Sequence, residues 1–119
     1  MKLYLAGPLR GIPEFNFPAF MRAAAQLRSE GHEVFNPAEK DIERYGTDIS
    51  RGNPEGREAV AASQHGFSLR EALAADLAWI CAEADGIALL PGWRNSKGAT
   101  AEHATALALS LVVIELGAV

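Results

Sequence analysis

Glu102 is the residue whose type and position first indicate chemistry. It belongs to the stretch LLPGWRNSKGATAEH, in which an apolar run ends at Pro91 and a polar loop leads into a predicted helix. The first N–H groups of a helix have no internal partners, so an anion is favoured there. Ser96 and Gly98 suit a phosphate, although Ser96 is also a typical helix cap. Glu102 is either a helix-dipole partner or an ionised carboxylate able to attack an electrophilic sugar carbon.

Asp76 is the candidate for a second carboxylate at the same site. It lies on a predicted long helix whose apolar stripe is formed by Leu73, Leu77 and Ile80. This periodicity leaves Asp76 either at the rim of the site or, with somewhat more weight, pointing to solvent. Two carboxylates at one site are what nucleophilic glycosyl transfer with acid–base assistance requires.

Two residues near the N-terminus are further candidates. Arg10 in GPLRG has a guanidinium group that matches phosphate geometry, although it can equally be an ordinary surface arginine. Tyr4 alternates with Leu3 and Leu5 on a predicted strand. If Tyr4 is a core residue, its hydroxyl group needs a hydrogen-bond partner.

Motifs for metals, cofactors and a serine nucleophile are absent from the sequence. The three histidines, His32, His65 and His103, lack the spacing of metal ligands. The stretch AGPLRG is not GxGxxG, and neither GxxxxGK[ST] nor GxSxG occurs. We therefore expect no metal and no cofactor.

Composition narrows the class of protein. The 119-residue chain has 49% hydrophobic residues, which suits one globular domain over residues 1–119. Its net charge of −4 comes without a basic block, so a nucleic-acid polymer is not an expected partner. No apolar run is long enough to span a bilayer, and the N-terminus is a poor signal peptide. The single cysteine, Cys81, cannot form an internal disulfide, and a cytoplasmic protein is expected.

Strands and helices are predicted to alternate along the chain. This order predicts an α/β fold with a parallel sheet of about four to five strands and helices on both faces. Residues 38–66 are predicted to be irregular, with one short helix, and to form a flexible insert or lid. The apolar runs predict strands over 2–6, 32–37, 86–92 and 111–116, and the periodic segments predict helices over 17–30, 68–85 and 98–110.

Three loops are expected to meet at one edge of this sheet. In parallel sheets, ligands bind beyond the carboxyl ends of the strands. The loops there are 7–16, the segment from Asn36 onward, and 91–98. Gly7, Gly11 and Asn36 are therefore candidates for substrate binding, and Trp93 either stacks on a base or packs within the protein.

Four stretches together resemble the nucleoside 2-deoxyribosyltransferase-like superfamily: LYLAGPLRG, NPAE, DLAWICAEADGIALLPGW and SKGATAEHATAL. Within this superfamily, the chain resembles the members of a small branch that is common in bacteria and their phages. It is also similar to the 2'-deoxynucleoside 5'-phosphate N-hydrolases. The most specific piece is Ser-x-Gly-x-x-x-Glu, which Ser96, Gly98 and Glu102 match, and only residues 38–66 lie outside the resemblance.

The resemblance implies a flavodoxin-like three-layer α/β sandwich and an enzyme that cleaves an N-glycosidic bond. It implies that Glu102 attacks C1' and forms a covalent glycosyl-enzyme. It also implies that Asp76 assists proton transfer and contacts the sugar, and that Tyr4 lies in the sugar site. The expected activity is that of an N-hydrolase or a 2-deoxyribosyltransferase, acting on a nucleoside or a nucleoside 5'-monophosphate.

The resemblance also bears on substrate binding and assembly. It implies that Arg10, Ser96 and Gly98 hold a 5'-phosphate, and that the protein is a homodimer or larger homo-oligomer. The chain differs from the phosphate-specific hydrolases at Pro8, where they carry a serine. The alternative hypothesis is a catalytically inactive nucleotide-binding sensor or accessory protein that keeps the pocket without turnover.

Overall fold

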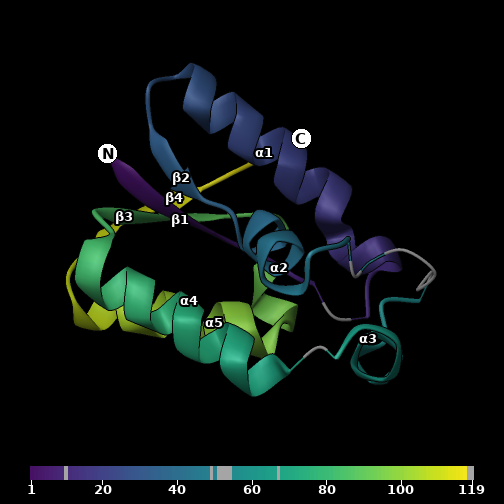
Figure 1. Cartoon of the computed structure of the whole chain (residues 1–119). Coiled ribbons are helices and arrows are strands. Elements are labelled where there is room, and N and C mark those ends of the chain that lie inside the picture. The colour runs from purple at the N-terminus through teal and green to yellow at the C-terminus, as the bar shows by residue number, and fades with distance from the viewer. Residues whose placement is uncertain (10, 49, 51–54, 67, 118–119) are drawn as a thin grey trace.

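A four-stranded parallel sheet forms the middle layer of the protein (Figure 1). The structure is a computed structural model that describes residues 1–9, 11–48, 50, 55–66 and 68–117. Within these residues the strands lie in the order β2-β1-β3-β4, and every neighbouring pair is parallel. This confirms the predicted α/β fold, which is consistent with a flavodoxin-like sandwich. The strands are Lys2–Ala6 (β1), Glu33–Phe35 (β2), Gly86–Leu89 (β3) and Val112–Glu115 (β4).

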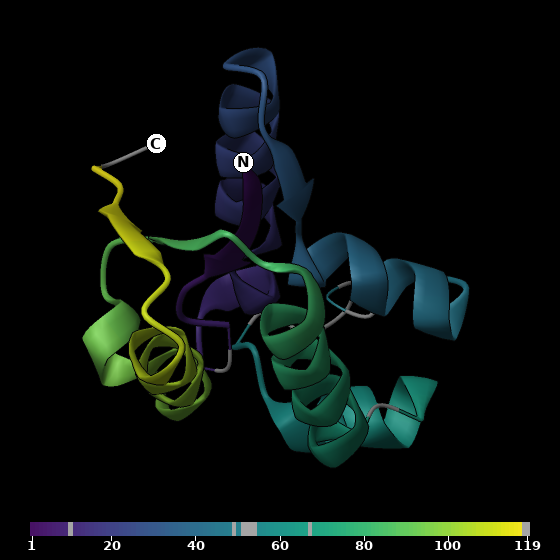
Figure 2. The same cartoon turned by 90° about the vertical axis from the view of Figure 1, so that its left-hand side faces the viewer.

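Helices cover both faces of the sheet. One face carries α1, and α4 and α5 lie together on the other (Figure 2). None of the helices in the described ranges is both long and apolar enough to cross a membrane. The α-helices are Phe17–Ser29 (α1), Pro37–Tyr45 (α2), Glu58–His65 (α3), Leu69–Glu83 (α4) and Lys97–Ala108 (α5), and the 3-10 helices are Pro13–Asn16 (η1) and Trp93–Asn95 (η2).

Alternation along β1 explains how the two helical layers pack on the sheet. Successive side chains of a strand point to opposite faces. Leu3 and Leu5 join the apolar cluster that contains Phe20 of α1. Tyr4 and Ala6 join the cluster that contains residues of α4 and α5. The side chains of β1 after Lys2 are therefore buried on both faces, as expected of a central strand in a parallel sheet.

β4 lies at the edge of the sheet and is much less covered than β1 and β3. Val112 and Val113 are 47% and 38% exposed. Leu107 and Leu109, at the end of α5, are also exposed. The β-branched run in LVVIEL therefore predicts the strand but not its exposure to solvent.

The expectation of an irregular segment with one short helix over residues 38–66 is wrong. The structure has two helices here, α2 and α3. α2 begins directly after β2 because the side chain of Asn36 accepts a hydrogen bond from Ala38 N at 3.0 Å and Pro37 occupies the first helical position. The predicted strand over 32–37 therefore ends earlier, at Phe35, because Asn36-Pro37 starts a helix.

The segment that leads to α3 is attached to the loop after β1. Gly11 N donates to the carbonyl oxygen of Gly56 at 2.8 Å. Gly56 has a φ of +64°, and a Cβ atom there would lie 2.0 Å from the carbonyl oxygen of Ile12. Only glycine permits this approach, so α3 begins close to the loop after β1 (Figure 1).

Candidate active site

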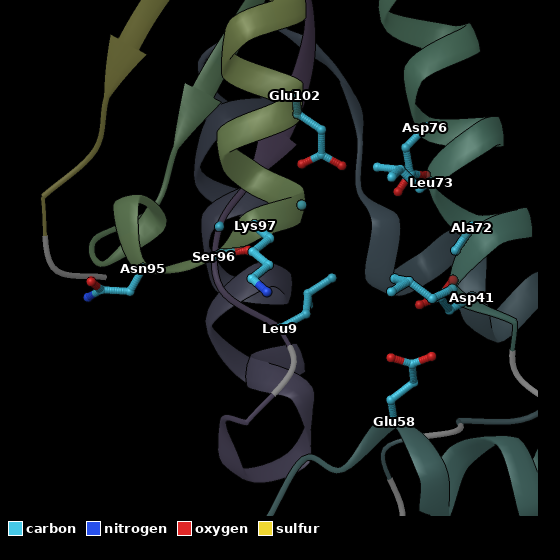
Figure 3. A pocket seen from close by; sticks show the side chains of 13 residues that line it. Leu9, Asp41, Glu58, Ala72, Leu73, Asp76, Asn95, Ser96, Lys97 and Glu102 are labelled. Atoms are coloured by element: carbon cyan, nitrogen blue, oxygen red, sulfur yellow. The ribbon is translucent and has the colours of Figure 1, made fainter.

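A pocket of about 540 Å³ lies at the carboxyl edge of the sheet (Figure 3). Its volume falls in the range of sites for small molecules and cofactors. The lining comes from the loop after β1, from α4, from the start of α5, and from α2 and α3. The charged residues in the lining are Asp41, Glu58, Asp76, Lys97 and Glu102.

Glu102 is buried in this pocket and held by Tyr4. The hydroxyl group of Tyr4 donates to Oε2 of Glu102 at 2.7 Å. Glu102 is 6% exposed and Tyr4 is 0% exposed. Because α5 begins at Lys97, Glu102 lies in the second turn, whereas the helix-dipole effect falls off within the first. The interpretation of Glu102 as a simple dipole partner is therefore disfavoured.

The environment of Tyr4 keeps its phenol protonated. Burial raises the pKa of Tyr4 well above its ordinary value of 10.0, and the nearby carboxylates of Glu102 and Asp76 raise the pKa further. At neutral pH, Tyr4 is thus a hydrogen-bond donor that faces both carboxylates. The partner that the sequence required for a buried tyrosine is a carboxylate.

Asp76 lies on the buried face of α4, so the sequence-based preference for a side chain that points to solvent is wrong. It is 8% exposed, and its neighbours on this face are Ala72 and Ile80. Leu73, which is predicted to lie in the apolar stripe, instead lines the pocket together with Leu69. Ile80 is buried as predicted, but Ala72 and Asp76 are buried in place of Leu73 and Leu77, because alanines and leucines occur on several sides of this helix.

Ser96, Gly98 and Gly7 line the pocket as expected. Oγ of Ser96 accepts a hydrogen bond from Ala99 N at 3.2 Å, so Ser96 caps α5 as well as facing the pocket. A Cβ atom on Gly7 would lie 2.7 Å from Cβ of Leu90. Glycine at this position allows the loop after β1 to pass close to the loop after β3.

Trp93 packs within the protein and is not part of the pocket lining. Its indole N–H donates to Oε1 of Glu115 at 3.2 Å. The centroid of its ring lies 4.4 Å from that of His103. The guanidinium carbon of Arg94 lies over the Trp93 ring, 4.6 Å from the ring centroid. These contacts join η2 to α5 and β4, which favours the packing role over stacking on a base.

Three other predicted binding residues have different positions. Asn36 is 1% exposed, caps α2 and does not line the pocket. Gly11 has a φ of +81° and binds Gly56 through its backbone, also outside the pocket lining. Arg10 lies outside the residues that the structure describes.

Three charged residues of the pocket were missed by sequence reasoning. Asp41 and Glu58 belong to α2 and α3, in the segment predicted to be irregular. Asn36-Pro37 was the signal that would have placed Asp41 on a helix next to the site. Lys97 stands between Ser96 and Gly98, at a position where the motif Ser-x-Gly-x-x-x-Glu specifies no residue type. Elsewhere in the described ranges, as here, no three His, Cys, Asp or Glu side chains are grouped so as to hold a metal ion.

Replacing Tyr4 with phenylalanine is expected to lower stability in a pH-dependent way. Tyr4→Phe removes the hydrogen bond to Glu102, which should cost about 1.5–3 kcal/mol because the acceptor is charged. The raised pKa of Tyr4 gives stability that is complete below the unfolded-state value near 10.0 and is lost as the pH rises above it. Denaturant unfolding at pH 8 and above pH 10 should show the difference between wild type and Tyr4→Phe shrinking at the higher pH. A difference that is constant with pH would contradict the buried donor role.

The fold and the pocket together define an α/β protein with a parallel sheet and an acidic site at its carboxyl edge. The chain belongs to the family described as Domain of unknown function (DUF4406), whose model matches residues 1–115. The match runs from β1 to the end of β4 and includes every residue that lines the pocket. Searches of the curated proteins and of the solved structures gave no match.

Proposed function

We propose that the protein cleaves the N-glycosidic bond of a nucleoside 5'-monophosphate or nucleoside through a covalent glycosyl-Glu102 intermediate. The observation that carries this proposal is the buried Glu102 carboxylate, oriented by Tyr4 at 2.7 Å and accompanied in the same pocket by Asp76. The resemblance to deoxyribosyltransferase-like enzymes assigns the nucleophile and the assisting acid to these two residues. The chemistry they offer is that of a retaining glycosidase.

The first step of the proposed reaction is attack on the sugar. An oxygen of Glu102 forms a bond to C1' as the bond between C1' and the base nitrogen breaks. The electron pair of that bond leaves with the base, and Asp76 assists by transferring a proton to it. Tyr4 fixes the attacking carboxylate in one orientation, because its hydroxyl group donates to Oε2.

The second step releases the sugar. Water attacks C1', the bond to Glu102 breaks, and the proton lost by water passes to the carboxylate that acted as acid. If a second base attacks instead of water, the product is a new nucleoside and the enzyme is a transferase. We favour the hydrolase, because Ser96, Gly98 and Lys97 at the start of α5 suit a phosphate.

A panel of nucleosides and 5'-monophosphates, in ribose and deoxyribose forms, tests the proposal. Free base should appear in the presence of the wild-type protein, and mass spectrometry with a slowly hydrolysed 2-fluoro-sugar analogue should find the protein heavier by the sugar phosphate. No base release and no adduct with any member of the panel would reject the enzyme. Tight calorimetric binding of an intact nucleotide without either product would favour the sensor. The homo-oligomer implied by the resemblance stays a prediction.

A further inference from the structure

Two side chains of opposite charge line the pocket without pairing. Lys97 is the first residue of α5, and Glu58 is the first residue of α3. Among the described residues, neither side chain has a hydrogen-bond or ion-pair partner. Asp41, which also lines the pocket, is held by Arg44 at 3.4 Å. Lys97 and Glu58 thus offer two separated charges to a ligand.

The positions of these charges relative to Glu102 matter for the proposed reaction. Figure 3 shows the carboxylates of Glu102 and Glu58 pointing into the pocket from opposite ends, with Lys97 extending from α5 between those levels. Displacement at C1' requires the leaving base to lie on the side away from the nucleophile. This orientation, which rests on the proposed function, puts the base toward Glu58.

Apolar side chains also form part of the pocket wall, and Figure 3 shows one of them, Leu73, beside Asp76. Leu9 comes from the loop after β1, and Leu69 and Leu73 come from α4. Leu69 is 40% exposed, so part of its apolar surface is open to a ligand. A planar heterocycle between such walls would cover this apolar surface while its edge meets Glu58.

We propose that the pocket selects a nucleoside 5'-monophosphate with a guanine-type base, whose phosphate binds Lys97 and whose N1–H and 2-amino groups donate to Glu58. A carboxylate is an acceptor with two oxygens, and guanine presents two adjacent N–H donors to it. Adenine, cytosine and uracil place an acceptor next to a donor on the same edge. One carboxylate oxygen would then face a lone pair, so these bases bind less well.

Calorimetry on the Glu102→Gln protein tests both ends of the pocket, because this substitution prevents turnover. The ligands are guanosine and inosine, with and without a 5'-phosphate, in ribose and deoxyribose forms; hypoxanthine lacks only the 2-amino group. Guanine should bind about ten- to hundredfold more tightly than hypoxanthine, and each monophosphate at least about tenfold more tightly than its nucleoside. Adding Glu58→Gln should reduce the guanine preference alone. Adding Lys97→Gln should reduce the phosphate preference alone.

Matched controls separate these effects from general changes in charge. Glu71→Gln and Lys40→Gln make the same substitutions outside the pocket lining and should leave both ratios unchanged. Equal loss of both ratios in either pocket variant, unchanged ratios in both, or no binding of any ligand would overturn the inference. If wild type releases base but the guanine and phosphate preferences are unchanged in both pocket variants, only this inference is rejected and the proposed function stands. The predicted ratios without base release would reject only the catalytic function.

Discussion

Glu102→Gln is expected to lower base release by about 10⁴-fold or more, because it removes the proposed nucleophile and leaves the pocket intact. Glutamine keeps an oxygen at the position that accepts the 2.7 Å hydrogen bond from Tyr4. It also removes a buried negative charge next to the Tyr4 hydroxyl group. The melting temperature of Glu102→Gln should therefore equal or exceed that of wild type, as is common when a catalytic charge is neutralised.

The measurement is a rate of base release under saturating substrate, with a melting curve for each protein. Glu71→Gln is the matched control, because Glu71 is exposed at the start of α4 and does not line the pocket. Glu102→Ala is a poorer test, because it leaves the buried Tyr4 hydroxyl group without its acceptor and should cost about 1–3 kcal/mol of stability. If a folded Glu102→Gln protein releases base as fast as wild type, or carries an adduct of the same mass as the wild-type adduct, Glu102 is rejected as the nucleophile.

Local signals in the sequence were enough to predict most of the fold. Ser68 stands three residues before Glu71, which is a capping pattern, and its Oγ accepts from Glu71 N at 3.3 Å at the start of α4. Gly31 follows the segment 17–30 that is predicted to be helical, and its φ of +94° is typical of a glycine that ends a helix. The apolar runs that became β1 and β3 are buried on both faces. These features are determined by neighbouring residues, so a pattern of a few residues contains the information.

The candidate site depends on contacts that local patterns do not encode. Tyr4 and Glu102 are 98 residues apart in sequence, and only the pairing of β1 with β3 brings α5 to Tyr4. Asp76 lies on a helix where leucine and alanine occur on several sides, so periodicity could not determine which face is buried. Glu58 reaches the pocket through the close approach of Gly56 to Ile12. Residue type and position made Glu102, Asp76 and Tyr4 candidates, the resemblance implied a role for each, and the structure brings the three together.

Asp76→Asn is expected to lower release of natural bases by about 10²–10⁴-fold, because it removes the group proposed to protonate the leaving base. The loss should depend on the leaving group. In a 4-nitrophenyl glycoside 5'-phosphate, the leaving group is 4-nitrophenolate, which departs without protonation. Asp76→Asn should therefore cleave this substrate at a rate within about tenfold of wild type. Asparagine is nearly the same size as aspartate, and Asp76 is 8% exposed, so the substitution adds no bulk to the buried face of α4.

The pH dependence gives a second readout for the same variant. The proposed mechanism needs Glu102 ionised and Asp76 protonated, so the wild-type profile of kcat/KM should be bell-shaped. Asp76→Asn should keep the rise that follows ionisation of Glu102 and lose the fall that follows deprotonation of the acid. If natural bases and the nitrophenyl substrate suffer equal losses, and the profile keeps both limbs, Asp76 positions the sugar and another group supplies the proton. The combination of a leaving-group-dependent loss with a missing alkaline limb is expected only of a general acid.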